Sequence, residues 1–285
     1  MVIYMRQNEF ELDEKYKLYR SVKELLHPTI SKRNISNYKI IVSEDLLLLR
    51  VFYPKKVSNI KHAVIYIPGE GEVTDCEGLY SDISSTLSKE LDQMVISIDY
   101  ENSADTLEEL YPIIYKTLAF IYIALRKENI PVENISLMGD STGANIVLNL
   151  VKRMIHEGMP VGNMLLFYPV LSGEYNGETK YPSILENTSV NYNLVEKLRR
   201  YYKDCPKELF PLAVEEKVEY PNTLLLSGNV DPLVDEAKAF AEKNEKIQLH
   251  IIDFAYHGFL NTKDKEIIRE YIRLLKEFMK VENND

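Results

Sequence analysis

The sequence predicts an α/β fold, in which a mainly parallel central sheet is covered by helices on both faces. Two observations support this prediction. Short apolar runs alternate along the chain with helical segments of about 10 to 20 residues, and polar turns separate them. The chain of 285 residues is 45% hydrophobic, which is enough to bury the core of one large domain. We therefore expect a single domain over residues 1–285.

The elements are expected in a regular order after an irregular start. The N-terminal part has an amphipathic helix over residues 8–27, which His27-Pro28 ends, and two short strands. Thr106 opens a later helix with the spacing of a capping box. The expected strands are 38–42, 46–52, 62–67, 94–100, 134–138, 163–170, 223–226 and 247–254. The expected helices from the middle of the chain onward are 76–92, 106–127, 142–157, about 234–243 and 263–279.

Residues 172–216 interrupt the alternation of strands and helices. They are rich in Tyr, Asn, Lys and Glu, and contain at most one or two helices, near 191–203. Long insertions in compact domains usually form lids, caps or binding segments. We expect the same of this one.

Composition excludes several classes of function. The net charge is −10, from 34 basic and 44 acidic residues, and no basic stretch stands out, so nucleic acid and anionic membrane surfaces are poor candidate partners. Cys76 and Cys205 are too few for a disulfide framework. The longest apolar runs, such as Leu118–Leu125, are too short to span a membrane. With no apolar signal core near Met1, a cytoplasmic location is expected. No histidine pair or glycine-rich phosphate loop indicates a metal or a cofactor.

Ser141 is the candidate nucleophile. It lies in the run G-D-S-T-G at residues 139–143, between an expected buried strand and an expected helix. A strand, a tight turn and a helix are the context of a nucleophile elbow, and the tightness of the turn explains the two flanking glycines. The alternative is an ordinary strand–helix turn in which Ser141 caps the helix.

His257 is the candidate base among five histidines. It follows the strand at 247–254 and precedes Gly258, so a loop would present its imidazole at the carboxyl end of the sheet. The other four, His27, His62, His156 and His250, lie at helix ends or within expected elements and are most simply structural or surface residues.

Asp231 is the candidate carboxylate partner of that histidine. It follows the strand at 223–226 and precedes Pro232, a pattern that also suits a simple helix N-cap. Asp235, Glu236 and Asp253 remain rival carboxylates. The order Ser141, Asp231, His257, with each residue at the carboxyl end of a strand, favours a catalytic triad.

The motifs resemble those of the hormone-sensitive-lipase-like branch of the α/β-hydrolases, over most of residues 60–262. The elbow G-D-S-T-G-A-N at 139–145 is similar to GDSxGGN, and S-I-D-Y at 97–100 to SVDY. Y-P-V-L at 168–171 has its counterpart in the family, D-P-L-V-D-E at 231–236 resembles DPLRDE, and H-G-F at 257–259 matches the base loop. The resemblance implies an α/β-hydrolase fold with about eight strands and a helical cap built from about 1–37 and 172–216.

One loop departs from the family pattern. The oxyanion loop HGGG falls on P-G-E-G at residues 68–71, so its histidine and its middle glycine are replaced. By position, the backbone N–H groups of Glu70 and Gly71 would stabilise the oxyanion together with that of Thr142. An inward-pointing Glu70 carboxylate would oppose this charge, whereas an outward-pointing one would leave the loop intact.

The resemblance implies a cofactor-free serine carboxylesterase that hydrolyses small acyl esters through an acyl-enzyme. Two alternatives remain open: a deacetylase of acetylated sugars or small metabolites, and a non-catalytic binder of small molecules with the same fold. The retained His257 argues against the binder, and the altered loop at 68–71 is the feature in its favour. The expected partner is a small-molecule ester, and the oligomeric state is left open, a homodimer included.

Overall fold

The central feature of the computed structural model is a twisted eight-stranded sheet. The structure describes residues 38–40, 47–54, 60–69, 76–100, 103, 107–173, 202 and 204–280. In these residues the strand order is β1-β2-β4-β3-β5-β6-β7-β8. Their bounds are Tyr38–Ile40, Leu48–Phe52, Ala63–Ile67 and Met94–Asp99 for β1 to β4, and Ile135–Asp140, Asn163–Phe167, Thr223–Gly228 and Ile247–Ile252 for β5 to β8.

The sheet is mainly parallel, as predicted. β2 pairs antiparallel with both β1 and β4, and every other neighbouring pair is parallel. Parallel strands end at the same edge of a sheet, so the turns after β3, β5, β7 and β8 gather there. This is the edge to which the sequence assigns the candidate residues.

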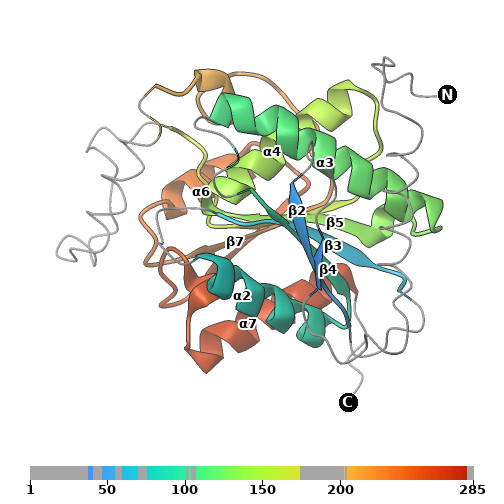
Figure 1. Ribbon diagram of the computed structural model, residues 1–285. Helices are drawn as coiled ribbons and strands as arrows, with labels where there is room; N and C mark the ends of the chain where they lie inside the picture. Colours follow the sequence, from blue (N-terminus) through green and yellow to red (C-terminus); the bar gives the residue numbers. More distant parts are fainter. Residues whose placement is uncertain are drawn as a thin grey trace.

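Helices cover both faces of the sheet (Figure 1). Helices α3 (Leu107–Lys127), α4 (Ser141–His156) and α6 (Val234–Glu242) lie on one face, and α2 (Cys76–Leu91) and α7 (Lys265–Met279) on the other. Each layer buries its own hydrophobic cluster against the sheet. β3, β5 and β7 are buried along their whole length, as parallel strands covered on both faces are.

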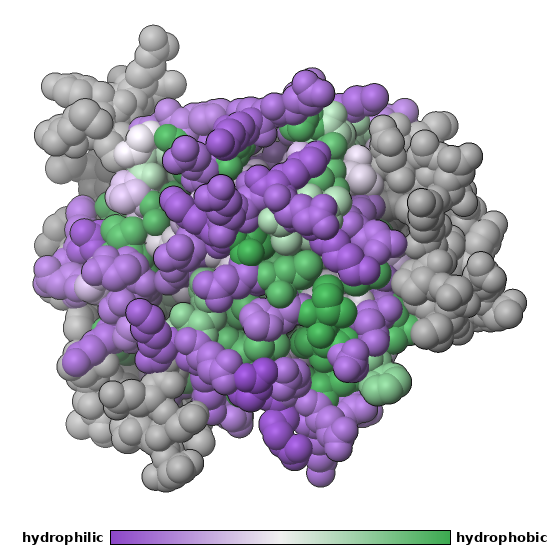
Figure 2. Space-filling view, turned by 180° about the vertical axis from the view of Figure 1, so that it is seen from behind, coloured by the Kyte–Doolittle hydropathy of each residue, from purple (hydrophilic) through white to green (hydrophobic). Residues whose placement is uncertain are grey.

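The strands at the two edges of the sheet are β1 and β8. β8 pairs with β7, and it is buried at its two ends and mostly exposed between them. Three of the four large hydrophobic residues exposed in the described part of the chain lie on β8 or just after it: Ile251, Phe254 and Tyr256. Hydrophilic side chains otherwise dominate the surface seen from behind, with hydrophobic ones gathered near its middle (Figure 2).

Several element bounds differ from those expected. β5 runs to Asp140 rather than 138, because its ladder with β6 continues to the pair Asp140–Phe167. β6 ends at Phe167 rather than 170, since Tyr168 adopts a positive φ of 36°, which no strand allows. β8 ends at Ile252, and Phe254 has a positive φ of 59°.

The expected helix at 8–27 and the cap over 1–37 lie outside the described residues. So does most of the insertion, of which the structure describes 172, 173, 202 and 204–216. The described part of the insertion contains turns and one short 3₁₀ helix, Lys207–Leu209. Within the described ranges, no helix is both long and apolar enough to span a membrane.

Candidate active site

Ser141 occupies a sharp turn between β5 and α4. Its φ of 50° lies in the left-handed region, which a residue with a Cβ rarely adopts. The flanking glycines are required by space: a Cβ on Gly139 would lie 2.5 Å from the Gly143 oxygen, and one on Gly143 would lie 2.1 Å from the Ile67 oxygen. The turn therefore has the compact geometry that the G-D-S-T-G motif predicts.

A chain of hydrogen bonds joins the three candidate residues. The Ser141 Oγ lies 2.9 Å from His257 Nε2. His257 Nδ1 lies 3.0 Å from Asp231 Oδ2 and 3.2 Å from Asp231 Oδ1. The Asp231 side chain is wholly buried and that of His257 is 11% exposed. Residues 116 positions apart in sequence thus meet at the carboxyl edge of the sheet.

Asp231 is held in place by its own turn. Its Oδ1 accepts a hydrogen bond of 2.8 Å from the Leu233 N–H, in a turn that precedes α6. Asp231 is not the N-cap that Asp-Pro suggested, because α6 begins at Val234 and Leu233 is its N-cap. The same carboxylate faces His257, and it has enough lone pairs for both partners.

The rival carboxylates have other partners. Asp235 is exposed and pairs with Lys238 at 2.9 Å. Asp253 accepts a hydrogen bond from the Asn229 side chain. Glu236 accepts hydrogen bonds from the backbone N–H groups of Leu171 and Ser172, both at 3.0 Å, and burial raises the pKa of its carboxyl group. Glu236 therefore holds the backbone at Leu171 and Ser172, where the insertion begins, against α6.

The other described histidines lie elsewhere. His62 precedes β3 at the opposite end of the sheet, where burial and then Lys61 lower its pKa. His156 pairs with Glu216, and His250 is exposed on β8. His27 lies outside the described residues. Among the residues that the structure describes, no three His, Cys, Asp or Glu side chains are grouped as a metal site would require.

Of the expected oxyanion donors, the structure describes only Thr142. It lies in the first turn of α4, where backbone N–H groups favour negative charge, and its Oγ1 accepts a 2.8 Å hydrogen bond from the Tyr202 hydroxyl. Glu70 and Gly71 lie outside the described residues. Gly69, which precedes them, passes directly over the elbow: a Cβ on it would lie 3.0 Å from Ser141 Cβ.

Sequence reasoning missed a cluster of polar groups behind Ser141. Asp140 is buried, and its carboxylate accepts hydrogen bonds from the Tyr66 hydroxyl, the Gly69 N–H and the Tyr168 hydroxyl. Tyr66 stands within an otherwise aliphatic buried strand, and this is the one signal in the sequence that such a partner exists. Burial, and then the Asp140 charge, raise the pKa of both tyrosines.

A second missed residue is Asn145 in α4. Its side-chain amide donates to the backbone oxygens of Val170 and Leu209, at 3.0 and 2.8 Å, and accepts from the Tyr111 hydroxyl. It thereby joins the nucleophile helix to both sides of the insertion. In the sequence, the position of Asn145 at the end of the elbow motif was the feature that could have indicated this role.

The comparisons with known proteins identify the family. A family model described as alpha/beta hydrolase fold matches residues 64–261, more than half of the chain. The chain belongs to the α/β-hydrolase family. The family predicted from the motifs is confirmed, and the similar solved structures include an esterase from the bacterial hormone-sensitive lipase family.

Curated relatives of this α/β-hydrolase are distant. An esterase of Acinetobacter venetianus is 26% identical over 199 residues, which are 67% of this chain and 63% of that protein. An esterase of Fusarium pseudograminearum is 22% identical over 196 residues, 64% of this chain and 60% of that one. The chain spans less than two thirds of the length of these relatives.

Solved structures show the same fold. A hyperthermophilic esterase from the archaeon Pyrobaculum calidifontis has a TM-score of 0.70 at 19% identity, covering 93% of this chain and 92% of that one. The bacterial esterase named above has a TM-score of 0.69 at 14% identity, covering 96% and 99%.

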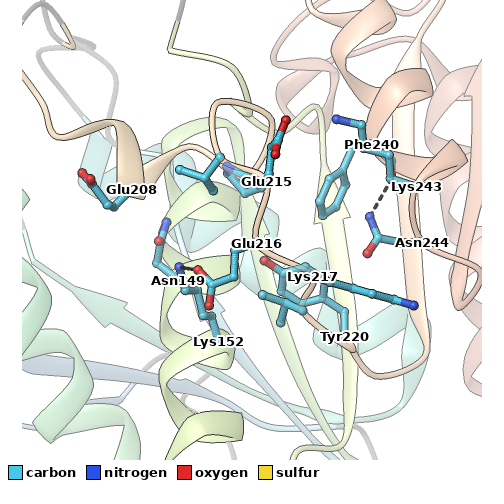
Figure 3. Close-up of a pocket in the computed structure, with 13 residues that line it drawn as sticks. Asn149, Lys152, Glu208, Glu215, Glu216, Lys217, Tyr220, Phe240, Lys243 and Asn244 are labelled. Carbon is cyan, nitrogen blue, oxygen red and sulfur yellow. Dashed lines mark hydrogen bonds and ion pairs between the residues drawn. The ribbon is translucent and has the colours of Figure 1, made fainter.

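This α/β-hydrolase also has a pocket of about 290 Å³ away from Ser141 (Figure 3). It lies between α4, the segment that precedes β7, and the end of α6. Tyr220 and Phe240 pack edge-to-face in its wall, with ring centroids 5.7 Å apart, and Lys152 pairs there with Glu216. None of the three hydrogen-bonded candidate residues lines this pocket.

Proposed function

We propose that this protein is a serine carboxylesterase that hydrolyses short-chain acyl esters through an acyl-enzyme intermediate. The observation that carries the proposal is the contact of 2.9 Å between Ser141 Oγ and His257 Nε2, with Asp231 at 3.0 Å from the other ring nitrogen. A hydroxyl within hydrogen-bond reach of an imidazole, which a carboxylate orients in turn, is the arrangement of an activated nucleophile. Its family membership and its esterase relatives support hydrolysis of esters.

Acylation would begin at the Ser141 hydroxyl. As Oγ bonds to the carbonyl carbon of the ester, its proton moves to His257 Nε2, and the carbonyl oxygen becomes an oxyanion. Asp231 holds Nδ1–H and stabilises the imidazolium, and remains ionised itself. The C–O bond to the alcohol then breaks, and the alkoxide leaves as the alcohol with the proton from Nε2.

Deacylation would repeat these steps with water. His257 takes one proton of a water molecule, whose oxygen attacks the acyl carbon bound to Ser141 Oγ. The second tetrahedral intermediate collapses, the carboxylic acid leaves, and Nε2 returns its proton to Oγ. Ser141 and His257 end the cycle in their starting protonation states, so no cofactor is required.

The oxyanion needs N–H donors on the side of the carbonyl away from His257. We assign this role to the backbone N–H groups of Thr142, Glu70 and Gly71, of which each is worth on the order of 3 kcal/mol. The position of Thr142 at the start of α4 and the passage of Gly69 over Ser141 support the assignment. A cytoplasmic location stays a prediction.

The test is hydrolysis of p-nitrophenyl acetate, butyrate and octanoate by the purified protein. Ser141→Ala should reduce activity to background, whereas Ser84→Ala, a buried serine of α2, should retain it. A preference for acetate or butyrate over octanoate is expected. Activity that survives in Ser141→Ala would overturn the mechanism.

Two further outcomes separate the alternatives. Activity on acetylated sugars far above that on simple esters would favour the deacetylase, which uses the same groups. Failure of Ser141 to react with a fluorophosphonate, together with no hydrolysis of any ester, would favour the non-catalytic binder.

A further inference from the structure

The buried carboxylate of Asp140 lies directly behind the nucleophile, and the mechanism above does not use it. Its Oδ1 accepts hydrogen bonds of 2.7 Å from both the Tyr66 hydroxyl and the Gly69 N–H. Its Oδ2 accepts one of 3.2 Å from the Tyr168 hydroxyl. All three partners are used as donors, which matches an ionised carboxylate, because a protonated one would need an acceptor for its own hydrogen.

These three donors come from separate parts of the fold. Tyr66 lies on β3, Gly69 lies two residues after β3 and next to Ser141, and Tyr168 follows β6. Asp140 itself is the last residue of β5. One carboxylate therefore fixes the elbow to Gly69 on one side and to the turn after β6 on the other.

Tyr168 continues the connection to the base. Its ring lies 4.8 Å from the His257 ring, centroid to centroid, at an interplanar angle of 57°. It adopts a positive φ of 36°, a costly conformation for a residue with a side chain. Its N–H donates to the Leu226 oxygen and its hydroxyl to Asp140, and these two bonds hold the strained residue against His257.

We propose that Asp140 is a positioning residue for the serine centre: its buried carboxylate holds Gly69 against Ser141 and the Tyr168 ring against His257. This inference rests on the proposed serine esterase function. It assigns Asp140 no contact with substrate.

His257 and Asp140 each have several polar or aromatic neighbours. His257 faces Asp231 from the turn after β7, and Ser141 and Asp140 from the elbow, with Tyr168 on its ring face. Asp140 faces Tyr66 and Tyr168, and Tyr80 of α2 lies next to Tyr66.

Burial raises the pKa of Asp140, while the three donors and the positive charge of His257 oppose this shift.

Two substitutions separate charge from geometry. Asp140→Asn keeps an oxygen for Gly69 and Tyr66 and removes the charge, whereas Asp140→Ala removes both. Asp140→Ala should lower kcat by about tenfold or more, with KM changed much less, since Gly69 loses its anchor beside Ser141. Asp140→Asn should retain most of the wild-type kcat, because its side-chain oxygen can still accept from Gly69 and Tyr66.

Asp82→Asn, which removes one charge from an exposed site on α2, is the matched control and should leave both kcat and KM unchanged. If Asp140→Ala does not fold, Tyr168→Phe keeps the ring beside His257 and removes the hydroxyl that donates to Asp140. It should lower kcat with little change in KM.

Failure of the inference differs from failure of the proposed function. A wild-type protein that hydrolyses esters through Ser141, with wild-type kcat in folded Asp140→Ala or in Tyr168→Phe, would overturn the role of Asp140. Absence of Ser141-dependent hydrolysis in the wild type would overturn the esterase proposal instead.

Discussion

The substitution Gly143→Ala tests how closely the elbow depends on packing. A Cβ on Gly143 would lie 2.1 Å from the Ile67 oxygen and 2.6 Å from both the carbonyl carbon and oxygen of Pro68, all of them backbone atoms. Ordinary contact begins near 3.4 Å, so the start of α4 must retreat by about 1.3 Å from the end of β3. Because Ser141 opens the same helix, its Oγ would move away from His257 Nε2 by a comparable amount.

The expected loss follows from this displacement. A misplacement of about 1 Å can reduce a rate by roughly 100-fold, so kcat for p-nitrophenyl acetate should fall by about that factor. The thermal midpoint should also fall, although alanine is intrinsically a better helix former than glycine by about 1 kcal/mol. Steric overlap with backbone outweighs that preference, because backbone cannot rotate away as a side chain can.

The control is Gly158→Ala, at the end of α4. Gly158 has a positive φ of 69°, and a Cβ at this position would have no neighbour within 4 Å, so alanine there costs stability without moving Ser141. Its kcat should match that of the wild type. Gly143→Ala with wild-type kcat and an unchanged or raised thermal midpoint would refute the steric argument.

Three further outcomes are expected. Asp231→Asn should lower kcat by about 10⁴-fold, because an amide does not support the imidazolium of His257; a loss below tenfold would exclude Asp231 as its partner. Glu236→Gln should gain stability relative to the wild type as pH rises from 4 to 8 in thermal unfolding. The pKa of Glu236 is raised in the folded protein, so the wild type loses stability with increasing pH and the glutamine does not; an unchanged difference across this range would contradict the assigned shift. Asn145→Ala should lower the free energy of unfolding by about 2 kcal/mol in urea titrations, since it leaves the buried Val170 oxygen without this donor, whereas the Leu209 oxygen keeps Asn149; a change below about 0.5 kcal/mol would mean that another group replaces Asn145.

The candidate residues were accessible from sequence because each follows a recognisable strand. Parallel strands bring their carboxyl ends to one edge, so the meeting of Ser141, Asp231 and His257 follows from topology. Choosing Asp231 over Asp235 and Asp253 was less direct. The structure separates them by contact: Asp231 is buried against His257, while the others pair with Lys238 and Asn229.

The strand bounds that differ from the prediction differ because of contacts with distant parts of the chain. Tyr168 has the β propensity and the apolar neighbours that extend a predicted strand to residue 170. Its backbone instead turns to positive φ, because its hydroxyl bonds to Asp140 and its N–H to Leu226. No local pattern encodes those two partners, since they lie 28 and 58 residues away in the chain.

The amino-acid sequence by itself determined the order of strands and helices and the glycine-flanked turn at Ser141, since periodicity and steric demand are local properties of the chain. The family followed from the resemblance of its motifs. The tertiary structure decided which polar side chains share a buried space. Only folding makes Asp140 the partner of Tyr66, Gly69 and Tyr168, and Glu236 the partner of Ser172. The physical reason is that a buried polar group must find its hydrogen-bond partner in three dimensions, and that partner is set by the packing of distant elements.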